Sequence, residues 1–136
     1  MKKQIYVGHS NDFDYERQLY KPLRESTLDQ KFTLVFPYEK RKKPFNSQEV
    51  IKTSDAMVAE VSYPSTGLGI EIGWAYVFKV PIISIAMEDA KVSRSPEMVS
   101  DNFIRYSDTK DMIEKLNRVL INCNTPHGAK APCLKI

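Results

Sequence analysis

The sequence lacks the marks of several protein classes. It has only two cysteines, Cys123 and Cys133, without the spacing of metal ligands. We therefore expect a reduced, cytoplasmic protein with no metal and no cofactor. The longest apolar run, residues 80–87, is too short to cross a bilayer and contains Pro81 and Ser84. The opening "MKKQIYVGHS" has a basic start but no apolar signal core, so neither secretion nor a membrane partner is expected.

Strong charge of either sign is also missing. The net charge is +3, and its one dense source is "EKRKKP", Glu39–Pro44. No aromatic residues are interleaved with these lysines, so a solvated loop is favoured over a nucleic-acid surface. A basic loop beside a site for a phosphorylated small molecule is a third interpretation. Repeats and low-complexity linkers are absent too, and 136 residues suffice for one domain with a single core.

Apolar strand-like segments alternate with amphipathic ones along the chain. The pattern predicts strands at 4–9, 31–37, 56–62, 80–87 and 103–107, and helices at 14–28 (kinked or broken at Pro22), 46–55, 69–79 and 108–123. This alternation is typical of an α/β fold, a single-domain doubly wound sheet (Rossmann or flavodoxin-like) of about five mostly parallel strands with helices on both faces. We expect residues 1–122 to form this domain and residues 123–136 an irregular C-terminal tail.

Two polar loops follow the first and third predicted strands, "GHSNDFD" and "YPSTGLGIE". Ligands of such sheets bind beyond the carboxyl ends of the strands, at the point where the strand order reverses. The two loops therefore predict a crevice between them.

Gly67, Gly69 and Gly73 surround Glu71 directly after a buried strand. Each glycine weakens a helix by roughly 1 kcal/mol relative to alanine, so we expect the backbone here to lie close to a ligand. Neither a P-loop nor the G-x-G-x-x-G dinucleotide fingerprint matches. Free N–H groups at a helix start favour an anion, and Ser65 adds a hydroxyl to the same turn.

Glu71 is expected in the first turn of the helix that begins near residue 69, where the helix dipole favours an ionised carboxylate. Facing a crevice, such a group can act as a nucleophile toward a sugar carbon. Spacing alone favours the alternative, a helix-start residue without a catalytic role.

Three segments resemble one family. "EVSYPSTGLGIEIGWA", residues 60–75, is similar to the nucleoside 2-deoxyribosyltransferases and their relatives, the 2′-deoxynucleoside 5′-phosphate N-hydrolases. Their pattern is a polar-Pro-Ser loop followed by Gly-x-Gly-x-Glu-Leu-Gly, with Ile72 here in place of the leucine. "IYVGHS", residues 5–10, is similar to the family's opening strand, and "VSDNFI", residues 99–104, to a segment that lends an asparagine to a neighbouring subunit. The resemblance runs from about residue 3 to residue 120.

The resemblance implies that Glu71 is the nucleophile that attacks the anomeric carbon and expels the base; water or a second base then resolves the glycosyl ester. It implies that the glycines let the sugar lie against the backbone, that Ser10 and Ser65 hold a 5′-phosphate, and that Ser95 reaches across a subunit interface. The substrate-binding residues on this basis are Tyr6, Gly8, His9, Ser10, Ser65, Gly67, Gly69, Ser95 and Asn102.

Two positions depart from the family pattern. Ser47 stands where the family has an aspartate that helps bind the sugar or protonate the leaving base. Glu49, Asp12 and Asp14 are candidate replacements for that acid. His9 stands where the family has a small residue; a lone histidine is more often a hydrogen-bonded loop residue than an acid, but this one lies at the crevice edge.

The function implied is that of an N-glycosidase for (2′-deoxy)nucleoside 5′-monophosphates, favoured by Pro64–Ser65 and the basic loop Lys40–Lys43. One alternative is a transferase that exchanges bases on free deoxynucleosides, which Asn102 favours. Another is a catalytically weak nucleotide-binding sensor, which Ser47 favours. We expect a small-molecule substrate, no nucleic-acid partner, and a homodimer or higher homo-oligomer with the active site completed across the interface.

Overall fold

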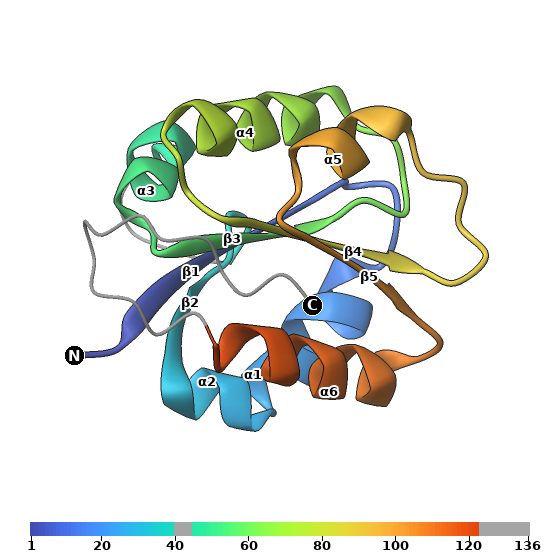
Figure 1. Cartoon of the computed structure of the whole chain (residues 1–136). Coiled ribbons are helices and arrows are strands. Elements are labelled where there is room, and N and C mark those ends of the chain that lie inside the picture. The colour runs from blue at the N-terminus through green and yellow to red at the C-terminus, as the bar shows by residue number, and fades with distance from the viewer. Residues whose placement is uncertain (40–44, 123–136) are drawn as a thin grey trace.

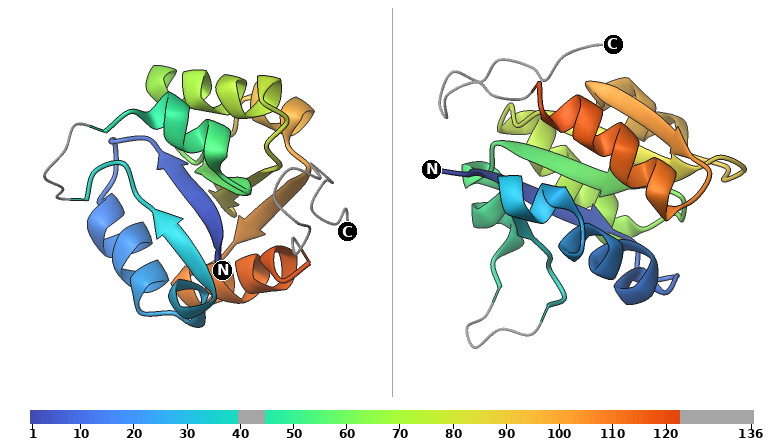
Figure 2. Two further views of the ribbon diagram at one scale, coloured as in Figure 1. Left: turned by 90° about the vertical axis from the view of Figure 1, so that its left-hand side faces the viewer. Right: turned by 90° about the horizontal axis from the view of Figure 1, so that it is seen from below.

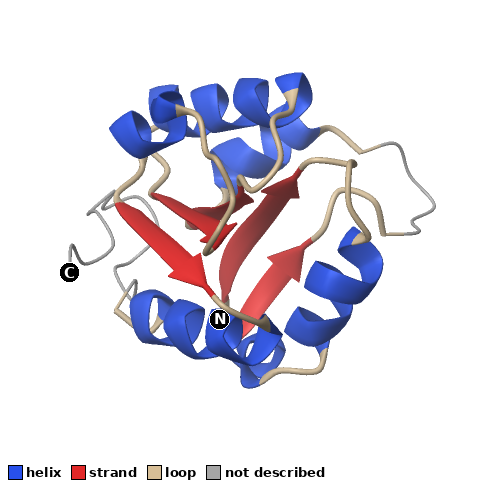
Figure 3. Ribbon diagram, turned by 90° about the vertical axis from the view of Figure 1, so that its right-hand side faces the viewer, coloured by secondary structure: helices blue, strands red, loops and turns tan. Residues whose placement is uncertain are grey.

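One parallel sheet forms the centre of the molecule. The structure is a computed structural model that describes residues 1–39 and 45–122. Five strands pair in the order β2-β1-β3-β4-β5, and every pairing is parallel. Figure 3 shows the strands in red between two layers of helices. The strands are β1 (Lys3–His9), β2 (Phe32–Val35), β3 (Ala56–Glu60), β4 (Ile82–Met87) and β5 (Asn102–Tyr106).

Helices cover both faces of this sheet (Figures 1 and 2). One face carries α3 (Ser47–Thr53), α4 (Thr66–Val77) and α5 (Arg94–Val99). The other carries a π-helical turn η1 (Glu16–Tyr20), α1 (Lys21–Arg24), α2 (Thr27–Lys31) and α6 (Thr109–Leu120). The predicted doubly wound α/β fold is confirmed. No helix within the two described ranges is both long and apolar enough to cross a bilayer.

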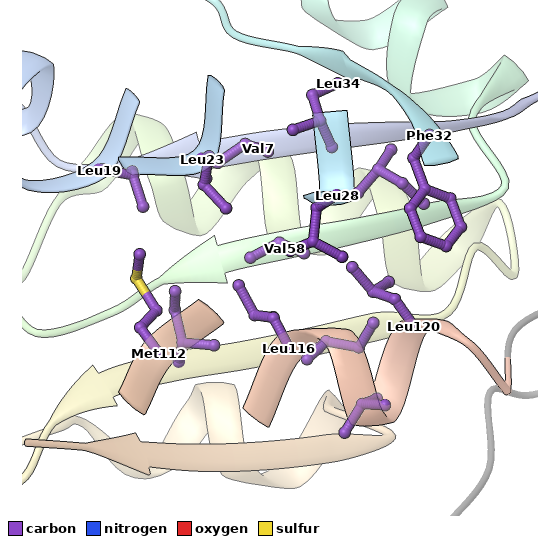
Figure 4. Packing of buried hydrophobic residues seen from close by; sticks show 14 of the residues in the cluster. Val7, Leu19, Leu23, Leu28, Phe32, Leu34, Val58, Met112, Leu116 and Leu120 are labelled. Carbon is purple, nitrogen blue, oxygen red and sulfur yellow. The ribbon is translucent and has the colours of Figure 1, made fainter. Parts of the chain in front are cut away.

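The larger core cluster lies under α6. Leucines from η1 to α2 meet the apolar stripe of α6 across β1 and β3 (Figure 4). The stripe consists of Met112, Leu116, Val119 and Leu120, all buried. Asp108 is the N-cap of α6, at the predicted start of this helix, and its side chain accepts the N–H of Asp111 at 2.8 Å. These contacts fix the sheet on this side.

Short helices depart most from the sequence prediction. The expected irregularity at Pro22 is a change from the π-helical η1 to α1 at Lys21, and Pro22 lies in the first turn of α1, where a missing N–H is tolerated. Neither α2 nor α5 was predicted as a separate helix; Ser26 caps α2 by accepting the N–H of Leu28 at 3.2 Å, and α5 contains Pro96. The tail 123–136 and the lysine-rich residues 40–43 lie outside the described residues.

Helix α4 begins three residues earlier than expected. Ser65 is its N-cap and accepts the N–H of Leu68 at 3.3 Å, so the helix starts at Thr66 and includes all three glycines. Glu71 therefore lies in the second turn, and the expectation of a first-turn position is wrong. The dipole effect falls off within the first turn, so it does not govern the ionisation of Glu71.

Candidate active site

A cavity lies beyond the carboxyl ends of β1 and β3, where the strand order reverses. It has a volume of about 210 Å³ and is lined by His9, Asn11, Tyr38, Ser65, Gly67, Leu68 and Glu71. Four of the residues expected at the site from the sequence line it, and three others, Tyr6, Gly8 and Ser10, lie on or directly after β1. The predicted crevice between the two loops is thus present.

Tyr6 and Glu71 form the central polar contact. The Tyr6 hydroxyl donates to Glu71 Oε2 at 2.6 Å. Tyr6 is 0% exposed, and its ring stacks on Phe45 with 6.1 Å between the ring centroids. Burial, and then the charge of Glu71, raise the pKa of the Tyr6 phenol, so the hydroxyl stays protonated and serves Glu71 as a hydrogen-bond donor.

The ionisation of Glu71 is set by burial and by two hydroxyls. Burial raises the pKa of its carboxyl above the ordinary value, while hydrogen bonds with Tyr6 and Ser47 lower the pKa in part. The helix dipole therefore does not set the ionisation of Glu71 as expected. Hydrogen bonds with Tyr6 and Ser47 favour the ionised form, and burial opposes it. Ser47, which stands where the resembled family has an aspartate, thus lies beside Glu71.

Gly8 makes room for the carboxylate. A Cβ at this position would lie 3.1 Å from Glu71 Oε1 and 2.8 Å from the terminal methyl carbon of Met57. At Gly67 and Gly69, by contrast, a Cβ would meet no atom of the described residues within 4 Å beyond its chain neighbours and the backbone of its own helix. Close approach inside the protein thus requires a glycine at position 8, and not at 67 or 69.

His9 is buried, and both of its ring nitrogens have partners. Nδ1 lies 2.7 Å from the carbonyl oxygen of Ser10, which can only accept, so Nδ1 carries the proton. Nε2, 2.5 Å from the Tyr20 hydroxyl, then accepts. Burial lowers the pKa of the ring, so the neutral form is favoured. Phe13, Tyr15, Tyr20 and Tyr38 surround it. His9 therefore shapes the cavity wall, and neither nitrogen is available as an acid.

A second cavity adjoins the first across Ser65 and Leu68. It has a volume of about 330 Å³ and is lined by Val61, Tyr63, Pro64, Ser65, Thr66, Leu68, Gly69, Ile72, Lys91, Ser93, Ser95 and Pro96. Ser95 and Gly69 thus border this second cavity and are not in contact with the one that holds Glu71. Ser10 is buried, and its hydroxyl oxygen accepts the N–H of Asp12 at 3.1 Å.

Asn102 lies far from Glu71 along the sheet. It begins β5 and is paired in register with Ile83, so it sits toward the amino ends of the strands. The residue is 9% exposed, and its Nδ2 has no hydrogen-bond partner among residues 1–39 and 45–122. Within one chain, Asn102 does not contribute to the cavity.

The three candidate acids do not reach Glu71. Glu49 is exposed on α3, and Asp12 and Asp14 are exposed in the loop after β1; Asp14 pairs with Arg17 at 3.2 Å. In the part of the chain that the structure describes, none of the three forms a hydrogen bond with Glu71, and no three His, Cys, Asp or Glu side chains are grouped so that they could hold a metal.

Glu60 was missed by the sequence reasoning. This buried carboxylate accepts the N–H of Ser62 at 2.6 Å and the Ser62 hydroxyl at 3.0 Å, and also the Tyr106 hydroxyl. It ties the end of β3 to β5 and fixes the start of the loop that leads to Ser65. The sequence did contain a signal for it, a glutamate within the apolar run "AMVAEVS". A glutamate is almost never fully buried without partners, so this position predicts a buried hydrogen-bonded carboxyl.

Comparison with known proteins supports the resemblance described above. No protein-family model matches the chain. A protein from Thermofilum pendens, named putative 2′-deoxynucleoside 5′-phosphate N-hydrolase 1, is 37% identical over 76 residues, which cover 52% of this chain and 53% of the relative. A protein of the same name from Methanosarcina mazei is 40% identical over 62 residues, covering 40% of this chain and 38% of the relative. The chain thus spans about half or less of the length of the curated relatives it matches.

Two solved structures share the fold. A CMP N-glycosidase from Clostridium botulinum superposes with a TM-score of 0.61 at 24% identity, covering 85% of this chain and 99% of that one. A 2-deoxyribosyltransferase from Bacillus psychrosaccharolyticus superposes with a TM-score of 0.58 at 17% identity, covering 98% of each chain. Together with the curated relatives, they confirm the resemblance to nucleoside 2-deoxyribosyltransferases and nucleotide N-hydrolases.

Proposed function

We propose that this protein is an N-glycosidase that cleaves the base–sugar bond of (2′-deoxy)nucleoside 5′-monophosphates, with Glu71 as the nucleophile. The observation that carries the proposal is the hydrogen bond of 2.6 Å from the Tyr6 hydroxyl to Glu71 Oε2, made beside a cavity at the reversal point of the sheet. The names of the curated relatives and of the glycosidase neighbour support the choice of substrate class.

Two steps follow from this arrangement. A Glu71 oxygen bonds to the anomeric carbon while the carbon–nitrogen bond to the base breaks, and its electron pair leaves with the base, which takes up a proton. Water then attacks the glycosyl ester and loses a proton; the sugar phosphate leaves, and the Glu71 carboxylate is restored. Tyr6 holds the carboxylate in place and favours its ionised form.

The 5′-phosphate is proposed to bind near Ser65, at the start of α4. Ser65 lines the same cavity as Glu71, and the first N–H groups of a helix favour an anion. Glu71 is six positions after Ser65, about 9 Å at the helical rise of 1.5 Å per residue, a distance that a sugar phosphate can span. A monophosphate is then expected to bind at least tenfold more tightly than its nucleoside, about 1.4 kcal/mol.

The proton for the departing base is proposed to come from solvent. Ser47 offers no carboxyl group, and Glu49, Asp12 and Asp14 do not reach Glu71. A Ser47→Asp variant would place a carboxyl beside Glu71, and its base release is expected to exceed that of the wild type.

The chain is further proposed to act as a homo-oligomer whose active site is completed across the interface, with Ser95 and Asn102 as the candidate contributions from a neighbour. Asn102 lies away from the cavity of its own chain, so a contribution to an active site would have to be made in trans. Sedimentation that shows a monomer at all micromolar concentrations would contradict this part of the proposal.

A base-release screen tests the activity. The wild type is incubated with dCMP, dGMP, CMP and deoxyuridine, and free base is followed by chromatography. Release from a monophosphate by the wild type but not by Glu71→Gln is expected, whereas Glu114→Gln, an exposed carboxylate on α6, should retain full activity. Transfer of the sugar to an added second base would instead identify a transferase.

A nucleotide-binding sensor is the second candidate, and one observation favours it. Ser47 replaces the carboxylate beside a Glu71 whose pKa is raised by burial, and both features slow base departure. Binding of a monophosphate without any base release would identify the sensor, and Ser47→Asp should then gain measurable release.

A further inference from the structure

Glu60 is a buried carboxylate that the proposed reaction does not use. It is the last residue of β3 and is 1% exposed. Its partners are all donors: the Ser62 N–H at 2.6 Å from Oε1, the Ser62 hydroxyl at 3.0 Å from Oε2, and the Tyr106 hydroxyl. Within the described ranges it takes part in no salt bridge. Removing a carboxylate from water is costly, which indicates that these bonds serve to hold their donors in place.

Ser62 is the donor that Glu60 holds most firmly. Its N–H and its hydroxyl both donate to the same carboxylate. The Ser62 hydroxyl oxygen also accepts the N–H of Met87, at the end of β4, at 2.8 Å. The residue is 6% exposed. The chain that leaves β3 is therefore fixed at Ser62 from two neighbouring strand ends.

The segment from Ser62 to Ser65 is short and stiff. Pro64 has a fixed φ and restricts Tyr63 before it to extended backbone. The Tyr63 ring also stacks on Phe13, with 5.1 Å between the ring centroids. Ser65 follows directly as the N-cap of α4. A displacement of Ser62 would thus be passed on to Ser65 and to the first turn of the helix.

Glu71 is held by different contacts. Tyr6 on β1 donates to it at 2.6 Å, and Ser47 on α3 forms a further hydrogen bond with it. Neither contact involves the loop after β3. A change confined to this loop and to the first turn of α4 should therefore leave the hydrogen bonds of the Glu71 carboxylate in place.

We propose that Glu60 is a positioning residue, which acts through Ser62 to hold Ser65 and the first N–H groups of α4 in place for the 5′-phosphate. The inference rests on the phosphate site of the proposed function, but not on Glu71 as the nucleophile. Loss of the Glu60 contacts should remove the affinity that the phosphate adds and leave the affinity for the nucleoside. A role confined to stability would instead weaken the binding of nucleotide and nucleoside to the same extent.

Titration calorimetry of variants made in a Glu71→Gln chain tests this, because the ligands are then not cleaved. The probes are dCMP and dGMP, each compared with its nucleoside. Glu60→Gln keeps the shape of the side chain but places an amide N–H₂ group among donors. Ser62→Ala removes one hydroxyl and is the milder second variant. Both should raise the Kd of the monophosphate, Glu60→Gln by about tenfold or more, with the Kd of the nucleoside unchanged.

Tyr106→Phe is the matched control. It removes a donor from the same carboxylate but leaves both bonds between Glu60 and Ser62. Its thermal midpoint should fall, while its preference for the monophosphate should equal that of the Glu71→Gln chain. In chains that retain Glu71, Glu60→Gln should raise KM for the monophosphate and leave kcat and its acidic limb unchanged.

Three results would overturn the inference, and they differ in what else they affect. A preference for the monophosphate that persists in folded Glu60→Gln and Ser62→Ala would overturn the inference alone. An equal loss of affinity for nucleotide and nucleoside would reduce Glu60 to a structural role. A Glu71→Gln chain that binds nucleotide and nucleoside equally would overturn the proposed phosphate site, and the inference with it.

Discussion

Removing one oxygen atom, in Tyr6→Phe, isolates the interaction on which the proposed mechanism depends. The phenyl ring keeps the buried shape and the stacking on Phe45, but Glu71 Oε2 loses the donor that lies 2.6 Å away. A hydrogen bond to an ionised group contributes about 1.5–3 kcal/mol, and one pKa unit corresponds to about 1.4 kcal/mol. Because the lost bond favours the ionised form, the pKa of Glu71 should rise by about one to two units.

The assay is kcat/KM for base release measured across pH. In the proposed mechanism ionised Glu71 is the reactive form, so activity should fall as pH drops through its pKa, and Tyr6→Phe should move this acidic limb upward by the same one to two units. At a pH on the limb, the rate should fall about 10- to 100-fold.

Tyr106→Phe is the matched control, since Tyr106 is also a buried tyrosine that donates to a buried glutamate, Glu60. It should lose stability without moving the acidic limb. An acidic limb that is unchanged in Tyr6→Phe would refute the assignment of Glu71 as the ionised nucleophile.

Three further predictions concern the same helix and strand. Gly8→Ala forces a Cβ to 2.8 Å from the Met57 methyl, so it should lower the free energy of unfolding by about 1–3 kcal/mol in urea melts and reduce base release. Lys79 directly follows the C-cap residue of α4 and has a φ of 61°, a conformation that glycine adopts without strain, so Lys79→Gly should raise the thermal midpoint, by about 1 kcal/mol in stability. Burial raises the folded-state pKa of Glu71 above its unfolded value. The wild type therefore loses stability as pH rises from the unfolded-state pKa to the folded-state pKa of this carboxyl. Glu71→Gln should therefore be at least as stable as the wild type at pH 7 in urea melts, and this advantage should disappear below about pH 4.

The sheet could be predicted from the sequence because its central strands β1, β3 and β4 are almost entirely buried and all five strands read as apolar runs bounded by polar loops. Five such runs alternating with helical segments leave few topologies, and the reversal point then follows from the strand order. The position of α4 could not be predicted in the same way. Three glycines argue against a helix by propensity, whereas the capping hydroxyl of Ser65 and the packing of Leu68, Ile72 and Ala75 on the sheet outweigh them.

The candidate site was predictable in its location and only partly in its chemistry. Tyr6 and Glu71 were both named from the sequence, but the raised pKa of Glu71 depends on burial that only the folded chain reveals. The contact between Ser47 and Glu71 joins α3 to α4, and local patterns do not contain such pairings. The glycines were read as ligand contacts, whereas the structure leaves Gly69 and Gly73 on an exposed helix surface.

The most direct test of the central claim is to trap the glycosyl ester. The wild type is incubated with a 2′-fluoro-2′-deoxynucleoside 5′-monophosphate, whose fluorine slows hydrolysis of the ester, then quenched in acid and digested for mass spectrometry. The account predicts a peptide containing Glu71 that is heavier by the fluorinated sugar phosphate, and no such adduct in Glu71→Gln. Base release by the wild type with no adduct, or with the sugar attached to a different residue, would contradict it.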